Sequence, residues 1–390
     1  MKVKPADRTA SVQEYYFSQK LAQIDRMRSE GLDVINLGIG SPDQPPSDNT
    51  VSALINEARK PTSHGYQSYS GIAALRKGFA DWYKKYFHVS LNPDNEILLL
   101  MGSKEGIMHI SMAFVNPGDE VLVPDPGYPT YSSVTNLVGG IVRKYVLTEE
   151  NGWLPDLKAL EKSDLSKVKI MWVNYPNMPT GVKGSVELFE KLVSFSRKHN
   201  ILLVNDNPYS FILNNDYLSL LQVDGAKETS LELNSLSKSH NMPGWRIGMV
   251  AGNSDYIKTI LKVKSNMDSG MFLGMQMAAV DALKNEEPWY TSINEVYRKR
   301  KKIVEEIMDL LKCHYDKSQV GLFVWGRIPG EIINCEVFIE EILNTSHVFI
   351  TPGFIFGDAG QRYIRISLCA NEKRLEEAKE RLKIHLKQKK

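Results

Sequence analysis

The stretch Ile201-Leu202-Leu203-Val204-Asn205-Asp206-Asn207-Pro208-Tyr209 places an apolar run directly before an acid, a turn and a tyrosine. A second run, at residues 231–236, leads into Ser237 and Lys238. Continuous rather than alternating apolar runs are typical of strands buried on both faces of a sheet that is covered by helices. The sequence therefore predicts an α/β fold with polar side chains at the strand ends. Further runs of this kind lie at residues 33–37, 96–103, 119–124, 142–148, 169–174 and 246–251.

The pattern changes after about residue 285, where Pro288 opens a long segment with apolar residues at helical spacing. Strand-like runs and a charged helix then follow. These features predict a boundary between a large domain at residues 36–285 and a small α+β domain at residues 286–390. The later strand-like runs lie at residues 322–328, 348–351 and 363–368, and the charged helix begins near residue 372.

The composition is that of an ordinary globular chain of 390 residues, 42% apolar and 24% charged. Its 48 basic and 46 acidic residues leave a net charge of +2, which gives no overall field to attract nucleic acid or an anionic membrane. Three cysteines without a CxxC pair favour a reducing compartment, and we find no signal peptide or membrane span. We expect a cytoplasmic protein that binds neither nucleic acid nor membrane, and no metal motif such as HExxH is present.

Lys238 emerges where a buried strand ends, which is where α/β sheets bind their ligands. Ser235 and Ser237 precede it, and Arg246 follows. Hydroxyls and a guanidinium can converge on a phosphate. Upstream, the turn Gly102-Ser103-Lys104 joins a strand to a helix, whose free backbone N–H groups and positive dipole end also suit a phosphate. These residues indicate a ligand that carries a phosphate group.

Several longer stretches carry a resemblance to a known family: VINLGIG at residues 34–40, GSKEGI at 102–107, AFVNPGDEVLVPDPGYPTY ending at Tyr131, SLSKSHNMPGWRIG ending at Gly248, and YIRISL at 363–368. They resemble the fold type I pyridoxal-phosphate aminotransferases of class I/II, and most of all the LL-diaminopimelate aminotransferase group. The resemblance implies a large domain with a mainly parallel seven-stranded sheet sandwiched by helices, and a small C-terminal domain. It also implies an N-terminal arm at residues 1–35 that packs on the small domain and the active site.

The resemblance implies pyridoxal 5'-phosphate as the cofactor and Lys238, Asp206 and Tyr209 as the catalytic residues. Lys238 would hold the cofactor as a Schiff base and carry the proton at the substrate α-carbon. Asp206 would keep the pyridine nitrogen protonated, because an adjacent carboxylate favours the charged ring. Tyr209 would donate to the phenolic oxygen of the cofactor, and Tyr128 would stack on its ring.

The same resemblance assigns the residues that hold the phosphate and the substrate. Tyr66 would reach the phosphate from a second subunit, which implies a homodimer. Arg365 would clamp the substrate α-carboxylate, while the backbone near Gly38 closes the other side. Tyr15, on the N-terminal arm, would cover the site. The remaining phosphate ligands would be Ser103, Lys104, Ser235, Ser237 and Arg246.

One position departs from the family pattern. In the segment NYPNMPTG at residues 174–181, Met178 stands where the family has asparagine. That asparagine donates to the cofactor's phenolic oxygen and thereby lowers the proton affinity of the Schiff base. Methionine cannot donate, so we expect a raised Schiff-base pKa unless Asn177 or Asn174 supplies the hydrogen bond.

The function implied is transfer of an α-amino group from an L-amino acid to a 2-oxo acid, 2-oxoglutarate, through two ping-pong half-reactions. The donor is LL-diaminopimelate or a neutral amino acid such as alanine or methionine, because these relatives share similar cores. A carbon–sulfur β-lyase or a decarboxylase would use the same lysine and aspartate. A different class is a non-catalytic cofactor-binding module such as the sensor half of a transcription regulator, although no DNA-binding extension is visible. Product analysis separates these alternatives.

Overall fold

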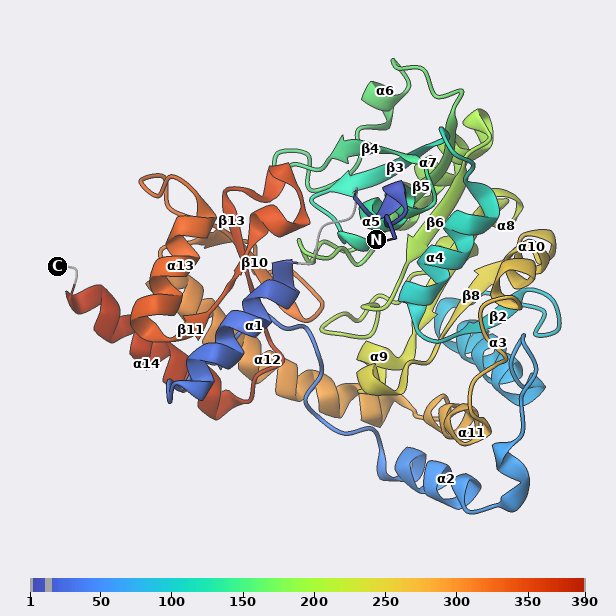
Figure 1. Cartoon of the computed structure of the whole chain (residues 1–390), viewed down its shortest axis with the longest axis horizontal. Coiled ribbons are helices and arrows are strands. Elements are labelled where there is room, and N and C mark those ends of the chain that lie inside the picture. The colour runs from blue at the N-terminus through green and yellow to red at the C-terminus, as the bar shows by residue number, and fades with distance from the viewer. Residues whose placement is uncertain (1–2, 11–15, 389–390) are drawn as a thin grey trace.

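The computed structural model describes residues 3–10 and 16–388, and its centre is a seven-stranded sheet (Figure 1). The strand order is β2-β8-β7-β6-β5-β3-β4. Only β8 runs antiparallel to its neighbours, so the predicted, mainly parallel sheet is confirmed. The strands are β2 (Ile97–Leu100), β3 (Glu120–Asp125), β4 (Ile141–Val146), β5 (Val168–Val173), β6 (Leu202–Asp206), β7 (Ser230–Ser235) and β8 (Gly248–Gly252).

Helices cover both faces of this sheet, so the inner strands β6 and β7 are buried along their whole length. Neighbouring strand residues point to opposite faces, so Leu98 packs into one apolar cluster and Leu99 into the other. Edge strand β4 is largely exposed, since it has a neighbour on one side only. The helices are α2 (Asp48–Ala58), α3 (Ala73–Phe87), α4 (Ser103–Phe114), α5 (Thr130–Leu137), α6 (Leu157–Leu160), α7 (Val186–His199), α8 (Ala226–Thr229), α9 (Leu236–Ser239), α10 (Ser254–Lys264) and α11 (Leu273–Ala282).

A smaller antiparallel sheet follows in the order β12-β13-β10-β9. Helix α12 begins at Glu287, with Pro288 in its first turn, where a missing backbone N–H costs nothing. It packs along α14, and α14 also contacts α13. The elements are α12 (Glu287–Leu310), β9 (His314–Tyr315), β10 (Phe323–Arg327), α13 (Cys335–Ser346), β12 (Thr351–Pro352), β13 (Tyr363–Ser367) and α14 (Glu372–Gln388).

The apolar run at residues 33–37 does not join the large sheet, which corrects one expectation. Only β1 (Ile35–Asn36) is a strand there, and it pairs in parallel with β11 (Val348–Phe349). Val34 and Leu37 are fully buried. The run is therefore buried like a strand of the large sheet, but it lies beside β11 instead.

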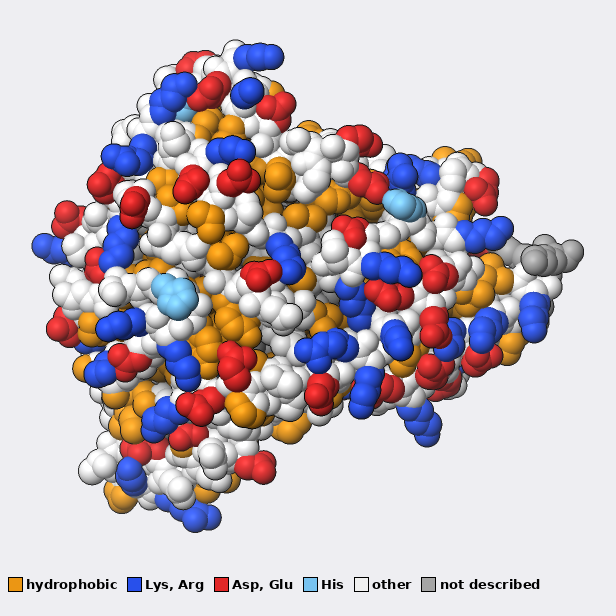
Figure 2. Space-filling view, turned by 180° about the vertical axis from the view of Figure 1, so that it is seen from behind, with side chains coloured by type: hydrophobic (Ala, Val, Ile, Leu, Met, Phe, Trp, Pro, Cys, Tyr) orange, Lys and Arg blue, Asp and Glu red, His pale blue; other side chains and the backbone are white. Residues whose placement is uncertain are grey.

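Helix α1 (Tyr16–Ser29) lies beside the C-terminal elements (Figure 1). The Tyr16 ring packs edge-on against Phe354 at 5.2 Å between centroids, and Phe17 packs against Phe349 at 6.4 Å. The surface seen from behind intermixes basic and acidic side chains, with hydrophobic ones between them (Figure 2). Within residues 3–10 and 16–388, no helix combines the length and the apolar character that a membrane span requires.

Candidate active site

The main cavity, of about 630 Å³, lies where strands β6 and β7 end. Asp206 is the last residue of β6, and Ser235 is the last residue of β7, directly before the short helix α9 that carries Lys238. Carboxyl ends of parallel strands meet at one edge of a sheet, so these groups come together from separate parts of the sequence. The predicted residues that line the cavity are Gly38, Ser103, Lys104, Tyr128, Asp206, Tyr209, Ser235, Ser237, Lys238, Arg246 and Arg365.

The structure does not bring every predicted residue to this cavity. Asn177 is buried outside its lining, and its side-chain oxygen accepts from the Thr180 hydroxyl at 2.7 Å. Asn174 does line it, yet its side-chain oxygen accepts from the Met178 backbone N–H at 2.8 Å. Tyr66 is 94% exposed, and Tyr15 lies outside the described residues.

Asp206 is a buried carboxylate with one oxygen in use and one orphaned. Its Oδ2 accepts from the Tyr131 hydroxyl at 3.0 Å, while Oδ1 has no hydrogen-bond partner among the described residues. Burial raises the pKa of Asp206 to about 7, and the Tyr131 hydrogen bond opposes that rise. A buried oxygen without a partner is costly, so this carboxylate is suited to a cationic N–H that enters the cavity.

Tyr131 is a residue of the site that sequence reasoning missed. Its ring stacks on Trp172 at 5.0 Å and 6° between planes, which fixes the direction of its hydroxyl. The signal was present in the PGYPTY run, but the run does not show that a residue of α5 reaches the end of β6.

The Lys238 side chain is partly buried in the cavity lining. Burial lowers its pKa, and the nearby Arg365 and Arg246 act in the same direction. Its Nζ donates to the carbonyl oxygen of Gly40 at 2.5 Å. A lowered pKa makes the neutral, nucleophilic form easier to reach.

Positive charge gathers at the N-terminus of α4. Gly102, with φ of +81°, turns the chain so that Ser103 begins the helix with free backbone N–H groups. A Cβ at Gly102 would lie 2.3 Å from Nη2 of Arg246, so only glycine admits this guanidinium. Burial and the neighbouring Arg246 both lower the pKa of Lys104. This end of the cavity is therefore suited to an anion.

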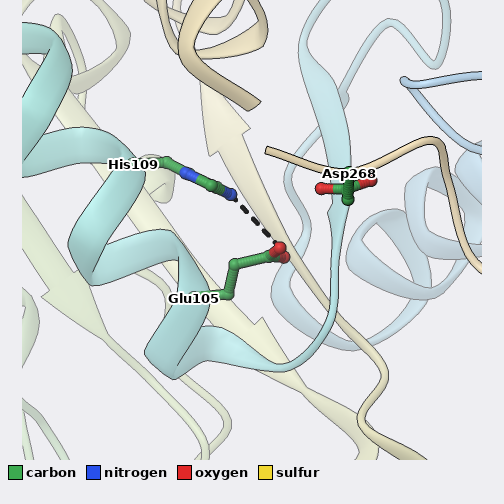
Figure 3. Close-up of side chains that lie close together, drawn as sticks. All are labelled: Glu105, His109 and Asp268. Carbon is green, nitrogen blue, oxygen red and sulfur yellow. Dashed lines mark ion pairs between the residues drawn. The ribbon is translucent and has the colours of Figure 1, made fainter. Parts of the chain in front are cut away.

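A cluster of side chains supports that turn (Figure 3). Glu105 accepts from the Met101 backbone N–H at 2.6 Å, and its other oxygen lies 3.2 Å from Nε2 of the buried His109. Atoms of Glu105, His109 and Asp268 lie within 4.8 Å of one another and could hold a cation. The Lys264 ammonium already lies 2.5 Å from Asp268, where it supplies positive charge. We therefore interpret the cluster as support for the turn.

Arg365 lies in an aromatic setting. Its guanidinium carbon lies 3.8 Å from the centroid of Phe323 and 4.6 Å from that of Phe356. Nη2 donates to the Gly38 carbonyl at 2.8 Å, and Nη1 lies 3.2 Å from the Met178 sulfur. The residue that departs from the family pattern thus contacts the predicted carboxylate clamp directly.

The residues present fit pyridoxal phosphate. The orphaned oxygen of Asp206 suits a protonated ring nitrogen, and the helix N-terminus with Lys104 and Arg246 suits the phosphate. Lys238 supplies an amine in the same cavity. Burial raises the pKa of Tyr209, which keeps its hydroxyl protonated as a donor.

Comparison with known proteins defines the class. Residues 32–382 match the model of the family "Aminotransferase class I and II", so the chain belongs to this family. The chain is a pyridoxal-phosphate-dependent aminotransferase, an enzyme that acts on amino acids and 2-oxo acids.

Particular relatives are similar over the whole length. An LL-diaminopimelate aminotransferase of Oleidesulfovibrio alaskensis is 43% identical, over 97% of this chain and 98% of the relative. One of Halothermothrix orenii is 40% identical, over 97% of each. Among solved structures, apo-BacF from Bacillus subtilis superposes with a TM-score of 0.94 at 33% identity, over 98% of each chain.

Proposed function

We propose that Lys238, Asp206 and Arg365 together carry out amino-group transfer from an L-amino acid to a 2-oxo acid, 2-oxoglutarate. The observation that carries this proposal is the meeting of the Lys238 amine, the buried Asp206 carboxylate and the buried Arg365 guanidinium in one cavity. Pyridoxal phosphate, when bound, supplies the electron sink that stabilises negative charge on the substrate α-carbon.

Lys238 binds the cofactor and then moves a proton at the substrate α-carbon, for which its lowered pKa suits it. Asp206 holds the proton on the ring nitrogen through its unused oxygen. Tyr209 would donate to the phenolic oxygen, and Tyr128 would pack on the ring, since both line the cavity. The side-chain amide N–H of Asn174 donates to the backbone carbonyl of Asp206, and Asn177 lies outside the cavity lining, so Tyr209 is the proposed donor at the phenolic oxygen.

Arg365 binds the substrate α-carboxylate with its paired N–H groups, and Gly38 closes the opposite side. The rings of Phe323 and Phe356 hold the guanidinium between them and exclude water from it. An arginine held in this way is pre-organised, so little side-chain freedom is lost when the substrate binds.

The phosphate is held at the N-terminus of α4, and we propose that a second copy of the chain completes this end. Tyr66 is 94% exposed in one chain and is free to reach the partner's phosphate site. The proposed enzyme is thus a homodimer with sites at the interface. The residues proposed to hold the phosphate within one chain are Ser103, Lys104, Ser235, Ser237 and Arg246.

The relatives named LL-diaminopimelate aminotransferase support LL-diaminopimelate as one candidate donor, with neutral amino acids as the other.

We also propose the division into an arm (1–35), a large domain (36–285) and a small domain (286–390). All three cysteines are free thiols, which supports the proposed cytoplasmic location.

The test is a single half-reaction followed by absorbance, with purified protein, pyridoxal phosphate and one amino acid at a time. Transfer converts the aldehyde form of the cofactor into its amine form and yields the matching 2-oxo acid. Release of ammonia without the amine form would indicate a lyase instead. The matched control is Lys238→Ala, which should lose the covalent cofactor band and nearly all turnover. Full activity in that variant would contradict the assignment.

A further inference from the structure

Apolar side chains gather at the end of the cavity that holds Arg365. Phe17 and Leu21 enter from α1, and Ile39 follows β1. The Phe17 ring lies 5.8 Å from the guanidinium carbon of Arg365, on the same group that Phe323 and Phe356 flank. This position is next to the proposed α-carboxylate site, where the side chain of a bound donor must pass.

The charged side chains that line the cavity are already assigned to binding the cofactor or the substrate α-carboxylate. Among the described lining residues, the charged side chains are Lys104, Asp206, Lys238, Arg246 and Arg365. Each is assigned above to the cofactor or to the α-carboxylate. Asp206 is the one carboxylate in that described lining, and it is 5% exposed at the end of β6. Against the described lining of one chain, a second ammonium on a donor would therefore meet rings and aliphatic groups rather than an anion.

We propose that the side-chain subsite formed by Phe17, Leu21 and Ile39 takes an uncharged, apolar side chain, so that the natural donor is a neutral hydrophobic or aromatic L-amino acid. This inference rests on the proposed aminotransfer and names its substrate class. Burying a charge without a partner is expensive, whereas apolar carbons gain by leaving water. The Met178 sulfur extends the apolar surface at Arg365.

The test compares two donors with the same carbon chain, L-2-aminoheptanoate and LL-diaminopimelate. The second differs by an ammonium and a carboxylate at the far end. In rapid-mixing half-reactions, we expect kmax/Kd for L-2-aminoheptanoate and L-phenylalanine to exceed that for LL-diaminopimelate by roughly tenfold or more. Equal or faster conversion by LL-diaminopimelate would overturn the inference while leaving aminotransfer intact. Conversion by none of the three would overturn the proposed function itself.

A matched pair of variants locates the subsite. Leu21→Glu places a carboxylate in the cavity lining, and Ala22→Glu places the same group on the exposed side of the same helix. Leu21→Glu should shift the ratio of kmax/Kd toward L-lysine and away from L-2-aminoheptanoate, by roughly tenfold. Ala22→Glu should leave the ratio unchanged. An unchanged ratio in Leu21→Glu with an intact cofactor spectrum would remove Leu21 from the subsite.

Discussion

Burial has opposite effects on the two central residues, because it disfavours whichever form is charged. It raises the pKa of Asp206 to about 7 and lowers that of Lys238. Burial therefore disfavours the charged form of each residue in the cofactor-free protein, although the role proposed for Asp206 uses its charged form. Burying a group that must carry charge at a functional site lowers the stability of the folded protein.

Removing the Asp206 charge should make this cost visible. Its pKa is higher in the folded chain than the usual value of 3.8, so the stability contributed by its protonated form is lost as pH rises through about 7. Asp206→Asn should therefore raise the stability of the cofactor-free protein more at about pH 8 than at about pH 5, with a difference on the order of 2 to 3 kcal/mol. Thermal melts at both pH values measure this.

The control for that experiment is Asp25→Asn on α1, where the carboxylate is exposed. The difference in stability between Asp25→Asn and the parent should be about the same at the two pH values. Asp206→Asn should at the same time abolish turnover, since an amide does not favour a protonated ring nitrogen. If Asp206→Asn is no more stable than the parent at about pH 8, the buried charge of Asp206 does not lower the stability of the protein.

Met178 offers a second prediction for a single residue. Asparagine at this position would add a donor beside the cofactor's phenolic oxygen and favour its anionic form. Met178→Asn should therefore lower the pKa of the Lys238–cofactor linkage. An absorbance titration reads this pKa directly, and no fall in the variant would show that the missing asparagine has no such effect. Met178→Leu, which adds no donor, is the matched control.

At the scale of elements, the N-terminus of α4 is held in place by its own first turn. Glu105 fixes the Met101 N–H, while His109 and Asp268 surround the carboxylate from α4 and the segment after α10 (Figure 3). Gly270, two residues past Asp268, approaches the backbone of Ser68 so closely that a Cβ would lie 2.6 Å from its carbonyl. The phosphate turn is thus braced by a segment that also supports the loop beyond Tyr66.

The hydrogen bond between Glu105 and the Met101 N–H should affect the affinity for the cofactor. Glu105→Ala removes the acceptor for Met101 and should raise the Kd for pyridoxal phosphate by roughly tenfold, as expected for a lost hydrogen bond to a charged group. Glu105→Gln keeps an acceptor and should bind the cofactor much more tightly than Glu105→Ala. Fluorescence quenching gives both constants, and Met112→Ala on the exposed side of α4 is the control. Equal affinities in the two Glu105 variants would exclude the hydrogen bond as the cause.

At the scale of the whole molecule, the two sheets both contribute to the cavity, and the proposed partner subunit would complete it. Arg365 reaches the cavity from β13 of the small sheet, and Lys238 reaches it from the end of the large one. A relative movement of the sheets would therefore separate the proposed substrate clamp from the proposed catalytic amine. Tyr66 would add a contribution that a single chain does not make to its own site.

Subunit mixing tests that contribution. Lys238→Ala and Tyr66→Ala homodimers should each have low activity. A hybrid dimer has one site that combines an intact Lys238 with Tyr66 from the other subunit. Activity after unfolding and refolding the two variants together should therefore exceed the mean of the variants refolded separately. No increase, with hybrid dimers shown by native mass spectrometry, would place Tyr66 outside the partner's site.

The sequence by itself determined the class of fold, the family and most of the polar side chains that line the cavity. Apolar runs and the residues that end them are local features, and Asp206 and Lys238 can be located from them directly. The same local reading placed residues 33–37 among the strands without showing that they pair with Val348–Phe349.

Only the tertiary structure decided how side chains from distant segments meet. It brought Tyr131 to Asp206, turned Asn177 away from the cavity and set the Met178 sulfur against Arg365. These contacts depend on helix orientation and strand partners far apart in the chain, which a local pattern of apolar and polar residues does not specify. Burial, and with it the pKa of Asp206, follows from that assembly.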